Sequence, residues 1–200
     1  MFSSLNYSVL AIDNRGHGES GGKHITMGHK DCQDVSLWVD YLTNRFKDCE
    51  IVVFGLSMGG ATVCLYSELQ KPKNVKLIIS DCAYSNAYEV FNSVSKSNFF
   101  LRVFSIMPVY DHYLKHRAGY RLSEVKVDDA IKNCNVPILL IHGSKDNFVP
   151  FYMHQILYDN CPQNLRKKHV IENVGHAESL PTKPDEYKKV VVEFLDSYIS

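Results

Sequence analysis

Short apolar runs and longer amphipathic stretches alternate along the chain. Five runs rich in β-branched residues predict strands. They cover residues 7–12, 51–55, 75–80, 136–141 and 168–172. Most of these runs are apolar without alternation, which is typical of strands that are buried on both faces of a parallel sheet. In 28–46 and 184–199, apolar residues recur at the spacing of an amphipathic helix. Strands that alternate with helices indicate an α/β fold with a mostly parallel sheet.

Residues 84–125 break this alternation. The segment contains no predicted strand and is rich in large apolar side chains, which are Tyr84, Tyr88, Phe91, Phe99, Phe100, Phe104, Met107, Tyr110 and Tyr113. Two interpretations stay open. The segment is either ordinary helical core or a helical lid that gives an apolar wall to a site. We predict one domain over residues 1–200, with the lid as an insertion at about 84–125.

The composition excludes several classes of protein. Of the 200 residues, 45% are hydrophobic, and 22 Lys and Arg balance 22 Asp and Glu, so the formal net charge is zero. This balance leaves no electrostatic attraction for nucleic acid or for an anionic membrane surface. No apolar run approaches the roughly 18 residues that span a bilayer, and the first residues lack the pattern of a signal peptide. We expect a cytoplasmic protein; a membrane anchor in a longer parent and the oligomeric state stay open.

The strongest local signal for chemistry is the run Gly55-Leu56-Ser57-Met58-Gly59, which follows a predicted strand and precedes a predicted helix. In that context G-x-S-x-G predicts a tight, strained turn that lifts the serine hydroxyl into the open at the carboxyl end of the strand. The N-terminus of the following helix offers unpaired N–H groups to a developing oxyanion. The alternative is a structural glycine-rich turn. The strand–turn–helix context favours Ser57 as a nucleophile.

A serine hydroxyl needs a base within hydrogen-bond reach and a group that orients the base. Asp146 and His176 each follow a predicted strand. Open α/β sheets bind ligands at the carboxyl ends of their strands, so both side chains are expected at the same edge as Ser57. The alternatives are a turn or helix-cap carboxylate and a surface histidine. Asp159, which lies in a helical stretch, is a weaker candidate for the acid.

Four motifs, in this order along the chain, resemble the α/β-hydrolase superfamily, close to its bacterial serine aminopeptidase-like and lysophospholipase-like hydrolases. They are the loop 13–20 (DNRGHGES), the turn 55–60 (GLSMGG), the run 136–150 (VPILLIHGSKDNFVP) and the turn 175–179 (GHAES). The resemblance covers nearly the whole chain. It implies Ser57 as the nucleophile, His176 as general base and then general acid, and Asp146 as the orienting carboxylate. It also implies the backbone N–H of Met58 as one oxyanion donor.

The chain departs from that family near its start. In the complete fold the loop that corresponds to 13–20 follows the fourth strand, whereas here it follows the first predicted strand. Strands one to three are therefore expected to be missing, which would leave 7–12 and 51–55 without a shared partner. A second oxyanion donor would be missing too, at a cost of about 10²–10³ in turnover. We expect an N-terminally incomplete α/β-hydrolase core, and a parent with three more strands to hydrolyse esters faster.

Three other patterns resemble nucleotide-, phosphate- or metal-binding motifs, but each lacks a feature that the motif requires. The run 16–21 spells the G-x-G-x-x-G of a dinucleotide site, yet residues 22–28 separate it from the predicted helix. The same stretch is one residue short of a phosphate-binding P-loop, and His24 stands where that loop needs Ser or Thr. His112 and His116 lack the glutamate and the third ligand of a zinc site, so a solvated helix face is the better interpretation. We predict no cofactor and no metal, and we interpret the six cysteines as buried, reduced thiols.

The sequence therefore predicts a serine hydrolase that cleaves a small-molecule acyl ester through an acyl-enzyme intermediate. Two alternatives stay open. The chain is a catalytically weak or inactive remnant of a hydrolase, or it is a peptidase, acyltransferase or perhydrolase that uses the same triad.

Overall fold

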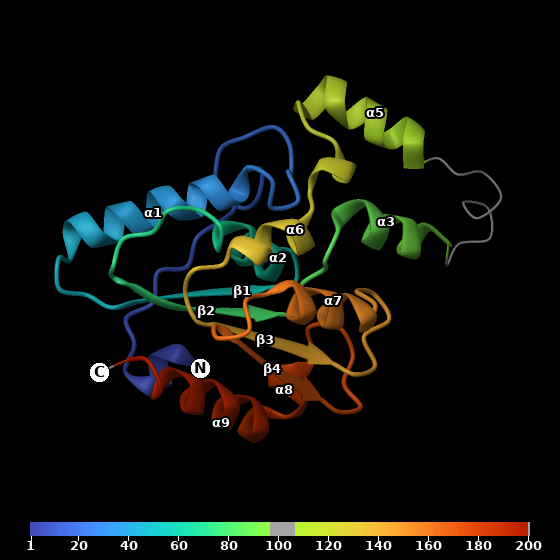
Figure 1. The fold of residues 1–200 in the computed structure, drawn as a ribbon. Helices are drawn as coiled ribbons and strands as arrows, with labels where there is room; N and C mark the ends of the chain where they lie inside the picture. The colour runs from blue at the N-terminus through green and yellow to red at the C-terminus, as the bar shows by residue number, and fades with distance from the viewer. Residues whose placement is uncertain (97–106, 200) are drawn as a thin grey trace.

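Four parallel strands form the centre of the molecule (Figure 1). The computed structural model describes residues 1–96 and 107–199. The strands are β1 (Ile51–Leu56), β2 (Val75–Asp81), β3 (Ile138–Gly143) and β4 (Arg166–Ile171), in the spatial order β1-β2-β3-β4. Each of them coincides with a predicted apolar run, and every pairing is parallel. The predicted α/β class with a mostly parallel sheet is confirmed.

The prediction of a strand over 7–12 is wrong. This segment runs outside the sheet from a short helix, η1 (Phe2–Leu5), to the loop at 13–24. Val9 is 56% exposed and Leu10 is 45% exposed. A strand is stable only where a neighbour receives its backbone hydrogen bonds, and β1 pairs only with β2 among the residues that the structure describes. The apolar run at 7–12 does not by itself show whether such a neighbour exists.

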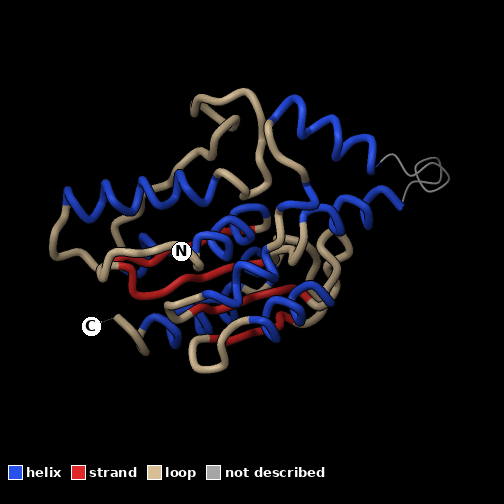
Figure 2. Tube along the Cα trace, turned by 45° about the horizontal axis from the view of Figure 1, so that its top comes forward, coloured by secondary structure: helices blue, strands red, loops and turns tan. Residues whose placement is uncertain are grey.

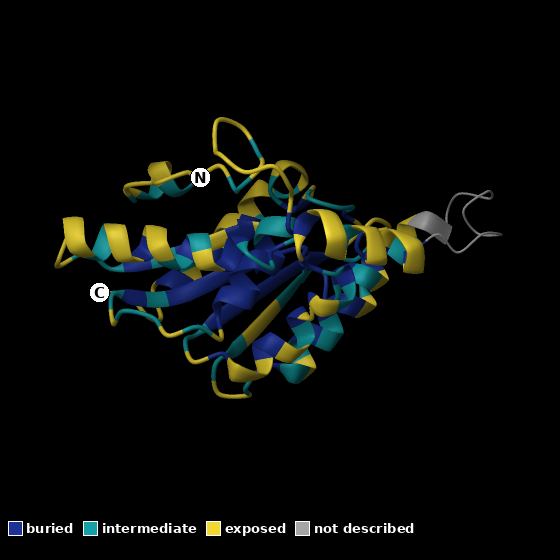
Figure 3. Ribbon diagram, turned by 90° about the horizontal axis from the view of Figure 1, so that it is seen from above, coloured by how far each residue is buried: buried dark blue, intermediate teal, exposed yellow. Residues whose placement is uncertain are grey.

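Helices cover both faces of the sheet and enclose one apolar core on each side (Figures 1 and 3). One face carries α1 (Asp31–Arg45), α2 (Met58–Tyr66), α6 (Val127–Ala130) and α7 (Tyr152–Asn160); the other carries α9 (Pro184–Leu195) and η1. Successive side chains of β2 alternate between the two cores, so that Ile78 packs in the first and Leu77 and Ile79 pack in the second. The helices predicted at 28–46 and 184–199 are confirmed as α1 and α9. Two further short helices are η3 (Ile131–Asn133) and α8 (Ser179–Thr182).

The described part of 84–125 is helical and projects past the sheet (Figure 2). It contains α3 (Ala87–Lys96), α5 (Met107–Ala118) and η2 (Leu122–Glu124), and an isolated antiparallel bridge joins Asn86 to Lys126 at its base. Phe99, Phe100 and Phe104 lie outside the described residues. No helix in the described part of the chain is both long and apolar enough to cross a lipid bilayer.

The carboxyl ends of the four strands lie level with one another. Leu56 at the end of β1 stands opposite Asp81, Asp81 stands opposite Ile141, and Gly143 stands opposite Ile171 at the end of β4. The loops that follow these strands therefore begin at one edge of the sheet, where open α/β sheets bind their ligands.

Candidate active site

Ser57 lies on a strained turn between β1 and α2. Its backbone has a φ of 55° and a ψ of −114°, a conformation that residues other than glycine rarely adopt. The turn is so tight that a Cβ on Gly55 would lie 2.1 Å from the carbonyl oxygen of Gly59. The Ser57 N–H donates to the carbonyl oxygen of Asp81 at 2.8 Å, which fixes the turn against β2. The backbone thus holds the Ser57 hydroxyl at the carboxyl end of the sheet.

The structure brings the three predicted side chains into one hydrogen-bonded row. The Oγ of Ser57 lies 2.8 Å from Nε2 of His176, and Nδ1 of His176 lies 2.7 Å from Oδ2 of Asp146. These residues follow β1, β4 and β3, so the level strand ends account for their convergence. The weaker candidate, Asp159, lies on α7 and accepts a hydrogen bond from Gln155 instead.

Asp146 is a buried carboxylate with a dense set of donors. It is 4% exposed, and its Oδ1 accepts hydrogen bonds from the backbone N–H groups of Phe148 at 2.9 Å and Val149 at 2.8 Å. Burial by itself raises the pKa of a carboxyl group, but hydrogen bonds from His142 and His176 outweigh it and hold the pKa of Asp146 well below its usual range. The group is therefore ionised and can hold the Nδ1–H of the histidine.

Sequence reasoning missed His142, which acts on Asp146 from inside β3. The Nε2 of His142 lies 3.0 Å from the carbonyl oxygen of Val149 and 3.3 Å from Oδ2 of Asp146. Both partners are acceptors, so this nitrogen carries the proton. The available signal was a polar residue in an otherwise apolar strand, four residues before the acid.

A second carboxylate, Asp81, lies beneath this row at the end of β2. It is 2% exposed, and its Oδ1 is buried without a hydrogen-bond partner in the described structure. Burial raises the pKa of Asp81 to about 6, although a hydrogen bond from Tyr187 opposes the rise. The sequence places Asp81 after an apolar run, as it places Asp146. It gives no sign that α9 covers Asp81, nor that Asp146 lies beside His176.

An apolar pocket of about 280 Å³ adjoins the Ser57 hydroxyl. The elbow supplies Met58, and α3 supplies Val90, Phe91 and Val94. The remaining walls are Met27, Tyr84 and Phe148. The ring centroid of Phe148 lies 4.8 Å from that of His176, so this aromatic side chain covers the imidazole as well.

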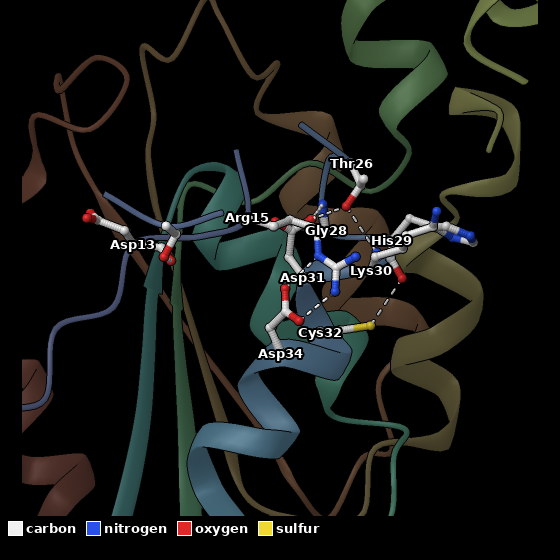
Figure 4. Close-up of polar contacts among 10 residues, drawn as sticks. Asp13, Arg15, Thr26, Gly28, His29, Lys30, Asp31, Cys32 and Asp34 are labelled. Atoms are coloured by element: carbon white, nitrogen blue, oxygen red, sulfur yellow. Dashed lines mark hydrogen bonds and ion pairs between the residues drawn. The ribbon is translucent and has the colours of Figure 1, made fainter. Parts of the chain in front are cut away.

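A polar network anchors the loop that carries Met27 (Figure 4). The fully buried Asp31 accepts hydrogen bonds at Oδ2 from the hydroxyl of Thr26 at 2.5 Å and from the N–H of Gly28 at 2.9 Å. Tyr84 donates to the carbonyl oxygen of Met27 at 3.0 Å. The loop is thereby held against the pocket on both sides of Met27.

The loop with the G-x-G-x-x-G spelling does not open a helix. Turns and a bend occupy residues 15–19, and α1 begins only at Asp31. Arg15 in this loop is held in a double ion pair with Asp34, with its Nε 2.6 Å from Oδ2. The loop lines a wide cleft of about 670 Å³, together with Trp38 and Tyr41 of α1. The arrangement lacks the helix N-terminus that a pyrophosphate needs.

Met58 is the first residue of α2, and the first N–H groups of a helix have no acceptor within the helix. This position agrees with the predicted oxyanion donor, which stays a prediction. His112 and His116 of α5 face each other with their Nε2 atoms 3.1 Å apart on an exposed surface. In the described structure, one group of three metal-binding residue types comes together, and it consists of Cys82, Asp146 and His176.

The fold and these loops are those of an α/β-hydrolase, and the comparisons with known proteins agree. The family described as serine aminopeptidase S33 matches residues 1–117. The chain belongs to this family and, with it, to the α/β-hydrolase superfamily.

Relatives of known sequence are longer than this chain. It is 30% identical over 198 residues to the uncharacterized protein YqkD of Bacillus subtilis (strain 168), a match that covers 98% of the chain and 65% of YqkD. It is 25% identical over 183 residues to the lysophosphatidylserine lipase ABHD12 of Danio rerio, covering 90% of the chain and 46% of that protein. The chain thus spans about half to two thirds of the length of these relatives.

Among solved structures, the esterase Pf2001 of Pyrococcus furiosus superposes with a TM-score of 0.73 at 24% sequence identity. The superposition covers 98% of this chain and 73% of the esterase. At this identity the likeness supports the fold.

Proposed function

We propose that this chain hydrolyses carboxylic esters with an apolar acyl group, through an acyl-enzyme intermediate on Ser57. The observation that carries the proposal is the continuous row of hydrogen bonds, 2.8 Å from Ser57 to His176 and 2.7 Å from His176 to Asp146. Such a row supplies an activated nucleophile, a base and the group that orients the base.

The proposed reaction has two halves. In the first, Nε2 of His176 takes the proton of the Ser57 hydroxyl while Oγ attacks the ester carbonyl, and the protonated histidine then gives that proton to the leaving alcohol. Asp146 holds the Nδ1–H and stabilises the charged imidazole. The N–H of Met58 stabilises the oxyanion. In the second half, water repeats these steps on the acyl-enzyme and releases the acid.

The pocket beside Ser57 supports an apolar acyl group. Besides the serine its walls are methionine, valine and aromatic side chains, and in the described residues they include no charged group. An aminopeptidase has to hold a protonated amine close to the scissile bond, and a carboxylate in the pocket would do so. The ester is therefore the better candidate. The relatives named as lysophosphatidylserine lipases act on an acyl ester, which agrees with this class of substrate.

The described helices of 84–125 support the lid interpretation within one domain. Val90, Phe91 and Val94 of α3 form one wall of the pocket, so the segment bears on the site as well as on the core. We propose that this wall selects the acyl chain. Phe91→Ala should enlarge the pocket and shift the preference toward longer p-nitrophenyl esters, measured as kcat/KM across chain lengths. Val109→Ala on the exposed face of α5 is the matched control, and equal profiles for the two variants would exclude selection by this wall.

Labelling of Ser57 tests the function directly. A fluorophosphonate probe should label the wild-type chain, and Ser57→Ala should abolish both the labelling and the hydrolysis of p-nitrophenyl butyrate. Ser85→Ala changes a buried serine outside the row and should leave both unchanged. If the folded wild-type chain stays unlabelled, it is an inactive relative of the hydrolases. Product analysis with an added alcohol distinguishes hydrolysis from acyl transfer, and an aminoacyl anilide tests the peptidase alternative.

A further inference from the structure

The mechanism leaves one nucleophilic side chain at the site without a role, the thiol of Cys82. Cys82 follows β2 directly, is 1% exposed, and has a positive φ of 45°. Its N–H donates to the carbonyl oxygen of Ile141 at 2.9 Å, which fixes the residue between β2 and β3. The thiol sulfur lies within 4.8 Å of a ring nitrogen of His176.

The thiol thereby joins a set of three ligand types. One atom each from Cys82, Asp146 and His176 lies within 4.8 Å of both others. They come from the ends of three adjacent strands, β2, β3 and β4, so the rigid edge of the sheet sets their spacing. Cys82 and Asp146 are buried, whereas the side chain of His176 is 20% exposed, so an ion can reach it from solvent.

Sulfur, imidazole nitrogen and carboxylate oxygen together suit zinc and the softer cadmium, whereas magnesium and calcium prefer oxygen ligands alone. Around tetrahedral zinc, a nitrogen and an oxygen ligand lie about 3.3 Å apart and a sulfur and a nitrogen ligand about 3.6 Å apart, given zinc–ligand bonds of about 2.0–2.3 Å. Atoms that lie up to 4.8 Å apart would therefore have to approach each other by up to about 1.5 Å. In addition, the 2.7 Å contact between Asp146 and His176 would have to open to admit an ion at Nδ1.

We propose that Cys82, Asp146 and His176 form an inhibitory site for Zn²⁺ and chemically similar cations. On binding, the Cys82 thiol releases its proton to water and forms the sulfur–metal bond, and Asp146 gives a carboxylate oxygen. The proton on Nδ1 of His176 moves by way of water to Nε2, so that Nδ1 can give its lone pair to the metal. Water completes the coordination.

The inhibition rests on the proposed function, whereas the binding does not. The proton relay uses both ring nitrogens of His176, one toward Ser57 and the other toward Asp146. A metal on either nitrogen removes one of these contacts. Metal binding and acyl transfer therefore exclude each other.

Metal binding is tested first, without any measurement of activity. Cd²⁺ is titrated into the reduced full chain while the ultraviolet absorption of the thiolate–cadmium bond is recorded, and Zn²⁺ affinity is measured by competition with a chromophoric chelator. Wild type should bind one Cd²⁺ with this absorption. Cys82→Ser should lose it and weaken Zn²⁺ binding at least about tenfold. Cys82→Ala, checked for folding by circular dichroism, should show the same loss of absorption and the same weaker Zn²⁺ binding as Cys82→Ser.

Matched controls test whether other cysteine or histidine side chains are the source of the cadmium signal. Cys134→Ser and Cys64→Ser alter buried thiols elsewhere in the core and should keep the absorption. His112→Ala removes the exposed histidine pair, which can bind zinc but gives no thiolate signal. The proposal is overturned if wild type shows no thiolate–cadmium absorption, or if Cys82→Ser and Cys82→Ala bind Cd²⁺ as wild type does.

Two further variants separate this proposal from the proposed function. Ser57→Ala should bind Cd²⁺ normally even though it is inactive, because Ser57 is not a ligand. Zn²⁺ should block fluorophosphonate labelling of the wild-type chain, EDTA should restore it, and Cys82→Ser should be labelled even with Zn²⁺ present. If the chain binds Cd²⁺ normally but the probe never labels it, the proposed metal site stands and the proposed esterase function is rejected. If Zn²⁺ binds at Cys82 but leaves the labelling unchanged, the proposal that this site is inhibitory is overturned.

Discussion

At Asp146, burial and hydrogen bonding act in opposite directions on one carboxyl group. Burial favours the neutral acid, but His142, His176 and two backbone N–H groups surround the carboxylate, and the charged form prevails. A neutral acid would be a weak partner for the protonated imidazole of the transition state. The donors around Asp146 thus serve the chemistry that we propose for Ser57.

Asp146→Asn tests this role. The amide can present an N–H to His176 and favour the wrong tautomer, so we expect kcat for p-nitrophenyl butyrate to fall roughly 10²–10⁴-fold with little change in KM. Asp159→Asn, on α7 and away from the row, is the matched control and should keep the wild-type rate. A rate for Asp146→Asn equal to that of the control would remove Asp146 from the mechanism.

Asp81 has the opposite balance, because burial dominates and its pKa is raised from 3.8 to about 6. A raised pKa in the folded state means that this group stabilises the fold fully below pH 3.8 and that the contribution is lost as the pH rises through about 6. Asp81→Asn keeps a neutral side chain at every pH. Relative to wild type, the variant should gain up to about 3 kcal/mol between acid and neutral pH.

Urea unfolding at about pH 4 and about pH 7.5 measures this difference. Asp48→Asn, at an exposed turn, should show no comparable dependence on pH. If Asp81→Asn gains nothing toward neutral pH, the Asp81 carboxyl group is not the source of a pH-dependent loss of stability.

Among the elements, the turn from β1 into α2 depends on the absence of side chains at particular positions. A Cβ on Gly60 would lie 2.6 Å from the carbonyl oxygen of Asp81, whereas a Cβ on Gly59 would meet nothing within 4 Å. The nucleophile turn and β2 thus approach each other at Gly60, next to the G-x-S-x-G string. Of the two adjacent glycines, Gly60 is therefore the one at which a side chain would clash.

Gly60→Ala should therefore destabilise the fold by about 1–3 kcal/mol, because a backbone oxygen has to move. Gly59→Ala should be neutral or stabilising by up to about 1 kcal/mol, since alanine favours the helix. Urea unfolding of both variants checks the order. Equal losses at the two positions would mean that the approach of α2 to β2 is looser than the structure indicates.

The sequence predicted the elements that are defined by their own residues. Four apolar runs are strands, and the positions of Ser57, Asp146 and His176 after them place the side chains together because parallel strands end at one edge. The strand at 7–12 failed because pairing depends on a neighbour that the run does not contain. Contacts such as His142 on Asp146 depend on how β3 and its loop fold back together, and no spacing in the sequence specifies this.

At the scale of the whole molecule, helices close the two faces of the sheet, while each of its two edge strands pairs on one side only in the described structure. Strand β4 occupies one end of the sheet and β1 the other, and β1 has no second neighbour among the described residues. Two of its side chains are well exposed, Phe54 at 40% and Leu56 at 42%. The ring of Phe2 from η1 lies 5.3 Å from that of Phe54, but it covers the edge only in part.

An open edge with exposed apolar side chains favours pairing between chains. We expect this chain to associate as its concentration rises, with Phe54→Lys reducing the association because a charge on an edge strand opposes pairing. Val109→Lys is the matched control, since Val109 is 73% exposed but lies on α5. Sedimentation velocity over a range of concentrations measures the effect. A wild-type chain that stays monomeric throughout, or an equal decrease for both variants, would show that the edge of β1 does not drive association. In that case the N-terminal residues around Phe2 protect the strand better than their partial contact indicates.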